Sequence, residues 1–145
     1  MDHEKFMRIA IEEAVKSQSE GGQPFGSVIV KDGQIVARAH NSVEQTGNPL
    51  GHAEVNALQL AHEMGINNLS GYTVYASFEP CAMCSAAIAW MGVSTVVFGA
   101  DPQDIPSTYP PKAHPFSCEE ILNRSGSSAT VIPHVLRAES AEVFK

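Results

Sequence analysis

Residues 72–98 read YTVYASFEPCAMCSAAIAWMGVSTVVF, and this stretch decides the fold class. Residues 72–77 and 95–98 are rich in β-branched and aromatic side chains, so both segments predict strands. Residues 82–91 are mostly apolar and stop at Gly92, which predicts a helix between the two strands. Strand, helix and strand in this order indicate a crossover unit, so part of the sheet is expected to be parallel.

The flanking segments extend this pattern to a layered α/β domain. Residues 27–30 and 34–39 are β-prone runs joined by Lys31-Asp32-Gly33, and the Asp-Gly step predicts an antiparallel hairpin. We also expect helices over 2–18 and 52–63, near 118–123 and from residue 139, and a strand near 129–133. Prolines break any regular pattern over 101–115. The whole chain, 1–145, is predicted to form one domain.

Composition narrows the class of partner. The chain has 145 residues, 43% of them hydrophobic, which suits one core. Nine Lys and Arg against 16 acidic residues give a net charge of −7, which disfavours a nucleic-acid partner because it repels phosphates. No segment approaches the ~20 apolar residues of a membrane span, and the N-terminus resembles neither a signal nor a transit peptide. We therefore expect a cytoplasmic protein without a membrane partner.

The cysteines point to metal chemistry. Cys81 and Cys84 form a C-x-x-C pair at a predicted helix start, and His52 opens another helix about 30 residues earlier. A helix N-terminus favours thiolate over thiol, and zinc readily binds thiolate and imidazole. A catalytic zinc keeps three protein ligands and leaves the fourth position for water. His52, Cys81 and Cys84 are thus predicted to bind one Zn²⁺ per chain.

Glu54 is the candidate proton carrier beside this metal. Zinc lowers the pKa of bound water from 15.7 toward ~7, but a separate group must carry protons to the leaving amine. Residues two apart on an ideal helix point roughly 200° away from each other, so His52 and Glu54 share a site only where the chain enters the helix. Gly51 is expected to permit that entry.

Two other interpretations use the same cysteines. Cys118 as a fourth ligand would close a structural zinc site, and Glu54 would then be an ordinary carboxylate at a helix start. A thioredoxin-like redox pair would leave the His-x-Glu fragment unused.

Four fragments carry a resemblance to a known family: GGQPFGSVIVKDG (21–33), NPLGHAEVNAL (48–58), SFEPCAMCSAAIAW (77–90) and VVFGA (96–100). With Asn41, they resemble the zinc-dependent cytidine/deoxycytidylate deaminase superfamily from about Phe6 to Asp101. The resemblance implies a three-layer α/β/α sandwich with a mixed five-stranded sheet, and a homodimer. The closest branch holds guanine, guanosine, fungal-type cytosine and transfer-RNA adenosine deaminases, and the context of Phe25 and Asn41 favours guanine-type members.

The resemblance also implies an activity and its residues. The protein would hydrolytically deaminate a free nucleobase or nucleoside, by attack of zinc-activated water on the amino-bearing ring carbon. Glu54 would protonate a ring nitrogen and then the departing ammonia. The implied substrate contacts are Asn41, Phe25, Trp90, the backbone of Ala53, and Ser77 in the turn that ends at Glu79. Asn41 as a turn cap, Phe25 and Trp90 as core residues and Glu79 as a helix-start carboxylate are the structural alternatives.

The resemblance weakens after Asp101, where DPQDIPSTYPPKAHPF (101–116) replaces the acidic, aromatic C-terminal stretch of guanine-type members. This segment would be either a lid that brings Tyr109, His114 or Phe116 to the ligand, or a rigid connection. The basic face expected of a transfer-RNA adenosine deaminase is missing. That enzyme, a cytosine deaminase and a structural-zinc protein remain as alternatives to a guanine-type deaminase.

Overall fold

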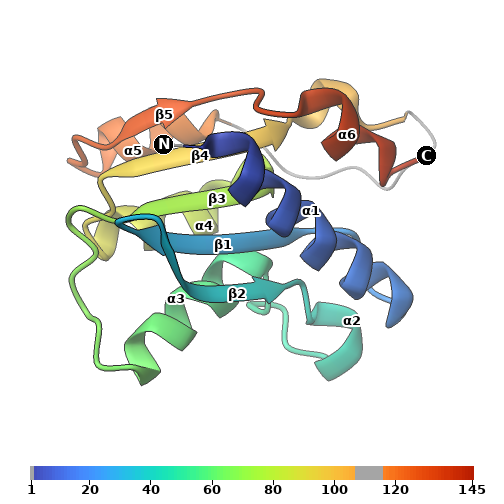
Figure 1. Ribbon diagram of the computed structural model, residues 1–145, viewed down its shortest axis with the longest axis horizontal. Coiled ribbons are helices and arrows are strands. Elements are labelled where there is room, and N and C mark those ends of the chain that lie inside the picture. The colour runs from blue at the N-terminus through green and yellow to red at the C-terminus, as the bar shows by residue number, and fades with distance from the viewer. Residues whose placement is uncertain (1, 107–115) are drawn as a thin grey trace.

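A five-stranded mixed sheet, in the order β2-β1-β3-β4-β5, forms the middle layer of the computed structural model (Figure 1). The structure describes residues 2–106 and 116–145. The strands are β1 (Gly26–Lys31), β2 (Gln34–His40), β3 (Thr73–Phe78), β4 (Thr95–Ala100) and β5 (Thr130–Ile132).

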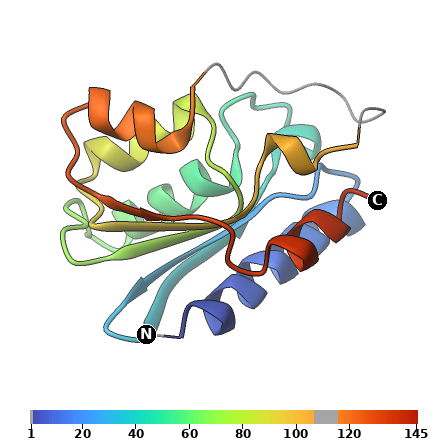
Figure 2. The same cartoon turned by 90° about the horizontal axis from the view of Figure 1, so that it is seen from above.

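Helices cover both faces of this sheet. They are α1 (His3–Ser19), α2 (Val43–Thr46), α3 (Ala53–Glu63), α4 (Ala82–Trp90), the 3₁₀ helix η1 (Pro102–Asp104), α5 (Cys118–Arg124) and α6 (Arg137–Glu142). Helices α1 and α6 lie on one face, and α3, α4 and α5 lie on the other (Figure 2). The expected three-layer α/β/α sandwich is confirmed.

Strand directions follow the sequence signals. Strands β1 and β2 are antiparallel, with Ser27 opposite Ala39. Asp32 and Gly33 between them have φ of 50° and 76°, the left-handed values that a tight hairpin turn requires. Strand β1 is antiparallel to β3, whereas β3, β4 and β5 are parallel. Both the predicted hairpin and the predicted parallel part of the sheet are therefore present.

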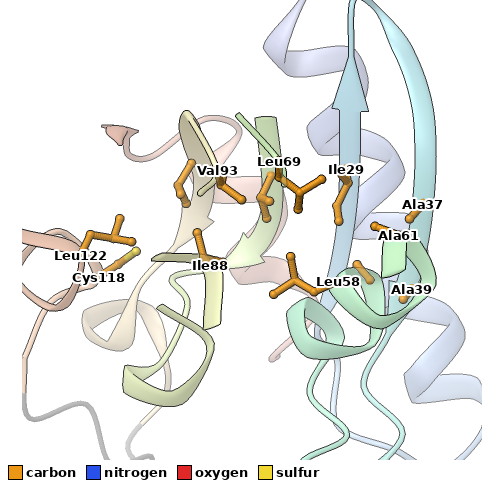
Figure 3. Close-up of a cluster of buried hydrophobic side chains, with 13 residues drawn as sticks. Ile29, Ala37, Ala39, Leu58, Ala61, Leu69, Ile88, Val93, Cys118 and Leu122 are labelled. Carbon is orange, nitrogen blue, oxygen red and sulfur yellow. The ribbon is translucent and has the colours of Figure 1, made fainter. Parts of the chain in front are cut away.

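Side chains alternate between the two faces of the sheet along each strand, so the protein has a separate hydrophobic core on each face. Ile29 packs with residues of α3, α4 and α5 in the larger cluster, part of which Figure 3 shows. Its neighbours Val28 and Val30 pack against Phe6 and Met7 of α1. Gly26 lets α1 approach β1, because a Cβ there would lie 2.0 Å from the carbonyl oxygen of Ala10. The sheet is thus anchored on both sides.

The C-terminal third departs in detail from expectation. The last helix begins at Arg137, two residues before the predicted start, and η1 occupies the start of the proline-rich segment. Asp101 caps η1, and Pro102 is tolerated there because the first turn of a helix needs no N–H from it. Tyr109 and His114 lie outside the described residues. Within residues 2–106 and 116–145, no helix has the length and apolar character needed to cross a membrane.

Candidate active site

Two helix starts bring the predicted metal ligands together. His52 is the N-cap of α3 and Cys81 the N-cap of α4, both with extended backbone, and Cys84 lies in the first turn of α4. One ligand atom from each of the three residues lies within 4.8 Å of the other two. In the described part of the chain this is the one such group of His, Cys, Asp or Glu side chains.

The donor set and its spacing fit zinc. Sγ of Cys81 and Sγ of Cys84 lie 3.5 and 3.6 Å from Nδ1 of His52. With Zn–S near 2.3 Å and Zn–N near 2.0 Å, a tetrahedral ion separates its nitrogen and sulfur ligands by about 3.5 Å. Three protein ligands leave a fourth position for water or substrate.

Electrostatics favour a thiolate at this site. A hydrogen bond from Cys84 and further interactions with His52 hold the pKa of the Cys81 thiol well below its usual range, although burial opposes them. Cys118 is different: it is fully buried in the larger core, and burial raises its pKa to about 12. Because Cys118 is absent from the ligand group, the closed four-ligand zinc site is wrong.

Glu54 lies beside the same group. It follows His52 by two residues in the first turn of α3, and its side chain is 7% exposed. Burial raises the pKa of Glu54 to about 7, and electrostatic repulsion by the nearby Cys81 thiolate adds to this effect. The backbone of His52 is extended and not helical, so the ~200° separation of residues two apart on an ideal helix does not apply to His52 and Glu54. Gly51 permits this entry into the helix through space and not through a left-handed φ, because a Cβ there would lie 2.6 Å from Oγ of Ser42.

A pocket of about 380 Å³ opens over these residues. This volume lies at the lower end of the ~300–1,000 Å³ typical of small-molecule sites. Its lining residues are Phe25, Asn41, Val43, Glu44, Pro49, His52, Glu54, Phe78, Glu79, Cys81, Ala82 and Met83.

The family is shown by sequence comparison. Residues 1–100 match the model of the cytidine and deoxycytidylate deaminase zinc-binding region. The chain belongs to this family. It is therefore a zinc-dependent deaminase, with His52, Cys81 and Cys84 as the zinc ligands.

Relatives of this deaminase divide between two substrate classes. It is 39% identical over 101 residues to the tRNA-specific adenosine deaminase of Aquifex aeolicus, and the matched region spans 69% of this chain and 67% of that protein. It is 41% identical over 106 residues to the guanine deaminase of Bacillus subtilis, and that match spans 72% of this chain and 68% of the relative. A solved structure from work on A-to-I editing by tRNA:A34 deaminases superimposes with a TM-score of 0.81 at 27% identity, covering 96% and 98%.

Two of the expected substrate contacts of the deaminase line its pocket. Asn41 follows β2 and Phe25 precedes β1, so both stand at the same end of the sheet. Asn41 is 3% exposed, and its N–H donates to the carbonyl oxygen of Phe25 (N···O 3.0 Å). The ring of Phe25 packs against Phe78 and Phe144, which form the wall behind it.

The other expected contacts lie elsewhere. Trp90 is 90% exposed and lies outside the pocket, because six residues of helix carry it about 9 Å along α4 from Cys84. Oγ of Ser77 accepts from the N–H of Gly26 at 3.0 Å and points away from the pocket face that its neighbour Phe78 lines. The Ala53 side chain is fully buried and is not part of the lining, which leaves its backbone role as a prediction.

Sequence reasoning missed part of the deaminase pocket. Val43 and Glu44 of α2, Pro49 and Met83 all line it. Glu44 had a usable signal, because it follows Asn41 by three residues and can reach back to it. Glu79 lines the pocket and also accepts a hydrogen bond from the N–H of Cys118 (2.8 Å). Glu79 is therefore both a pocket residue and a carboxylate at the start of a helix, here α5.

Proposed function

We propose that this deaminase acts on a free amino-bearing nucleobase or nucleoside, with a guanine-type purine as the best candidate. The observation that carries the proposal is the charge of the pocket. Glu44, Glu54 and Glu79 line it, and the lining contains no lysine or arginine among the described residues. Such a wall repels a phosphate and accepts hydrogen bonds from ring and amino N–H groups.

The surface charges favour the same class of substrate. Six of the described basic residues form ion pairs with carboxylates: Arg8, Lys16, Arg38, Arg124, Arg137 and Lys145. Lys5 and Lys31 instead lie over the rings of Phe6 and Tyr72. Neutralised cations contribute little to the positive field that attracts a nucleic acid. A small neutral base suits this surface better than a transfer RNA.

The residues of the site have separate roles in the proposed reaction. His52, Cys81 and Cys84 would hold the zinc, which would supply an activated water near neutral pH. Glu54, buried at the pocket floor, moves protons to a ring nitrogen and then to the departing amine. Phe25 stacks on or beside the ring, and Asn41 orients it by hydrogen bonding. The water-derived oxygen remains on the ring carbon, and ammonia leaves with the protons that Glu54 has carried.

A second candidate is the deamination of adenosine in transfer RNA. Two observations favour it: the 39% identity to a tRNA-specific adenosine deaminase, and the superposition of nearly the whole chain on the solved structure from work on tRNA:A34 deaminases. An anionic pocket does not exclude a flipped base, because a base carries no phosphate itself.

Ammonia release separates the candidates. Zinc-loaded protein is incubated with guanine, cytosine, their nucleosides and related amino-bearing bases, beside the Glu54→Ala variant as control. Turnover of a free base that disappears in the variant supports the proposal. Inosine formation only in an anticodon stem-loop supports the second candidate, and silence on every compound by a zinc-replete protein contradicts both.

The homodimer implied by the family stays a proposal. Trp90, Leu60 and Met64 are large apolar side chains exposed by 90%, 39% and 58% on the helices beside the site. Light scattering coupled to size-exclusion chromatography measures the mass of the assembly. A mass of one chain, 15.5 kDa, at working concentrations would contradict the dimer.

A further inference from the structure

Asn41 is held from several directions at the edge of the pocket. Its backbone carbonyl oxygen accepts from Oγ of Ser17 (2.9 Å) and from Nε2 of Gln45 (3.0 Å). Its side-chain Nδ2 donates to Oε1 of Glu44 at 2.6 Å and makes a longer contact of 3.5 Å with the carbonyl oxygen of Gln23. The same Oε1 of Glu44 also accepts from the N–H of Gln23 (3.2 Å). Asn41 therefore has a fixed backbone and an oriented amide.

The chemistry of Glu44 decides which end of the Asn41 amide faces it. A carboxylate only accepts hydrogen bonds, so the NH₂ group must point toward Glu44, and a charge-assisted bond of this kind is strong. The reversed amide would set two oxygens against each other. Oδ1 of Asn41 accepts no hydrogen bond from the described residues, is not among their buried unpartnered atoms, and belongs to a residue that lines the pocket.

We propose that Glu44 is a positioning residue: it holds the Asn41 amide so that Oδ1, an acceptor, faces the substrate. The site then requires a hydrogen-bond donor, such as a ring N–H, at that edge of the base. This inference rests on the proposed function for the class of molecule bound. It explains why an exposed glutamate lies at the mouth of a pocket whose floor already contains a carboxylate for the chemistry.

Binding measurements test Glu44 without relying on turnover. Guanine is titrated into zinc-loaded protein carrying Glu54→Ala, with and without Glu44→Ala. Alanine removes the oxygen that accepts from both Asn41 and Gln23, so the Asn41 amide loses its fixed direction. We expect Kd to rise about 10-fold, the effect of one hydrogen bond. Glu63→Ala, the same change on an exposed residue of α3 outside the pocket, should leave Kd unchanged.

A conservative variant separates positioning from a general loss of structure. In Glu44→Gln, the N–H of Gln23 holds the glutamine oxygen in place, so Asn41 keeps its acceptor. We expect guanine binding to stay within about threefold of the parent protein. Asn41→Asp places two carboxylates together and should bind poorly.

Methylated ligands identify the donor. Among guanines methylated singly at N1, N7 or N9, one should lose affinity with the parent protein and lose much less with Glu44→Ala. Equal Kd for the parent and Glu44→Ala, or an equal loss of affinity in Glu44→Gln and Glu44→Ala, overturns the role of Glu44. Guanine that binds but releases no ammonia from the unmutated enzyme overturns the proposed substrate alone, and guanine that does not bind overturns both proposals.

Discussion

The rings of Phe25 and Phe144 lie 5.5 Å apart between centroids, so the penultimate residue of the chain supports a wall of the substrate pocket. Phe144 is 7% exposed and also contacts Phe78 at 5.4 Å. Phe144 follows α6, so the segment after this helix, which carries none of the zinc ligands, shapes the site through this aromatic cluster.

Phe144→Ala should weaken substrate binding and the fold together. Truncating a buried phenylalanine costs about 3 kcal/mol, and without its support the Phe25 ring becomes less ordered. We expect a lower urea midpoint and a higher KM, with kcat changed less. Phe144→Leu keeps most of the volume and should cost under about 1.5 kcal/mol. An unchanged KM in the folded alanine variant would show that the cluster does not shape the pocket.

Glu54→Gln should separate metal binding from catalysis. The amide keeps the size of the side chain but cannot carry a proton, so kcat should fall by about 10²- to 10⁴-fold. Zinc content, measured by atomic spectroscopy, should stay at one ion per chain because Glu54 is not a ligand. Cys84→Ala should instead lose the zinc and part of the stability. Equal zinc loss in both variants would contradict these roles.

Cys118→Ala tests whether Cys118 is a fourth zinc ligand. Cys118 packs in the larger core beside Leu122, away from the ligand group. The variant should keep one zinc per chain and lose about 1–2 kcal/mol of unfolding free energy, from a small cavity. Zinc loss on this substitution would revive a closed four-ligand site.

His40 and Glu13 should make stability depend on pH. Nδ1 of His40 lies 2.9 Å from Glu13, and Nε2 lies 3.0 Å from Glu20. Burial lowers the pKa of His40, but these hydrogen bonds outweigh it and raise the pKa above its usual 6.5. Burial likewise opposes the hydrogen bonds from His40 and Arg38, which nevertheless hold the pKa of Glu13 below its usual 4.5.

The signs define a window for this effect. A raised histidine pKa stabilises the fold fully below about pH 6.5 and loses that effect as pH rises through the folded-state value. A lowered glutamate pKa stabilises above about pH 4.5 and loses its effect as pH falls through the folded-state value. His40→Gln should therefore lower Tm by about 3 °C at pH 5.5, and by much less at pH 9. An equal loss at both pH values would show that the charge of His40 is irrelevant to stability.

Local sequence signals determined the elements and the metal ligands. Asp32-Gly33 fixed the hairpin because its φ values suit few other residues, and the alternation of strand and helix over 72–98 required a parallel crossover. His52, Cys81 and Cys84 were recognisable because each stands at a helix start, where the backbone favours thiolate and leaves side chains free to meet.

Tertiary structure alone decided which side chains line the pocket. Trp90 and Ser77 lay close in sequence to ligands yet face away, because the direction of a side chain depends on its turn of helix or its alternation along a strand. Glu44 lines the pocket from a short helix that has no pattern of its own. Phe144 lies far from the motifs and packs against Phe25 and Phe78 of the lining. Motif spacing specifies chemistry over a few residues; the shape of a pocket arises from contacts between distant segments, which no local pattern encodes.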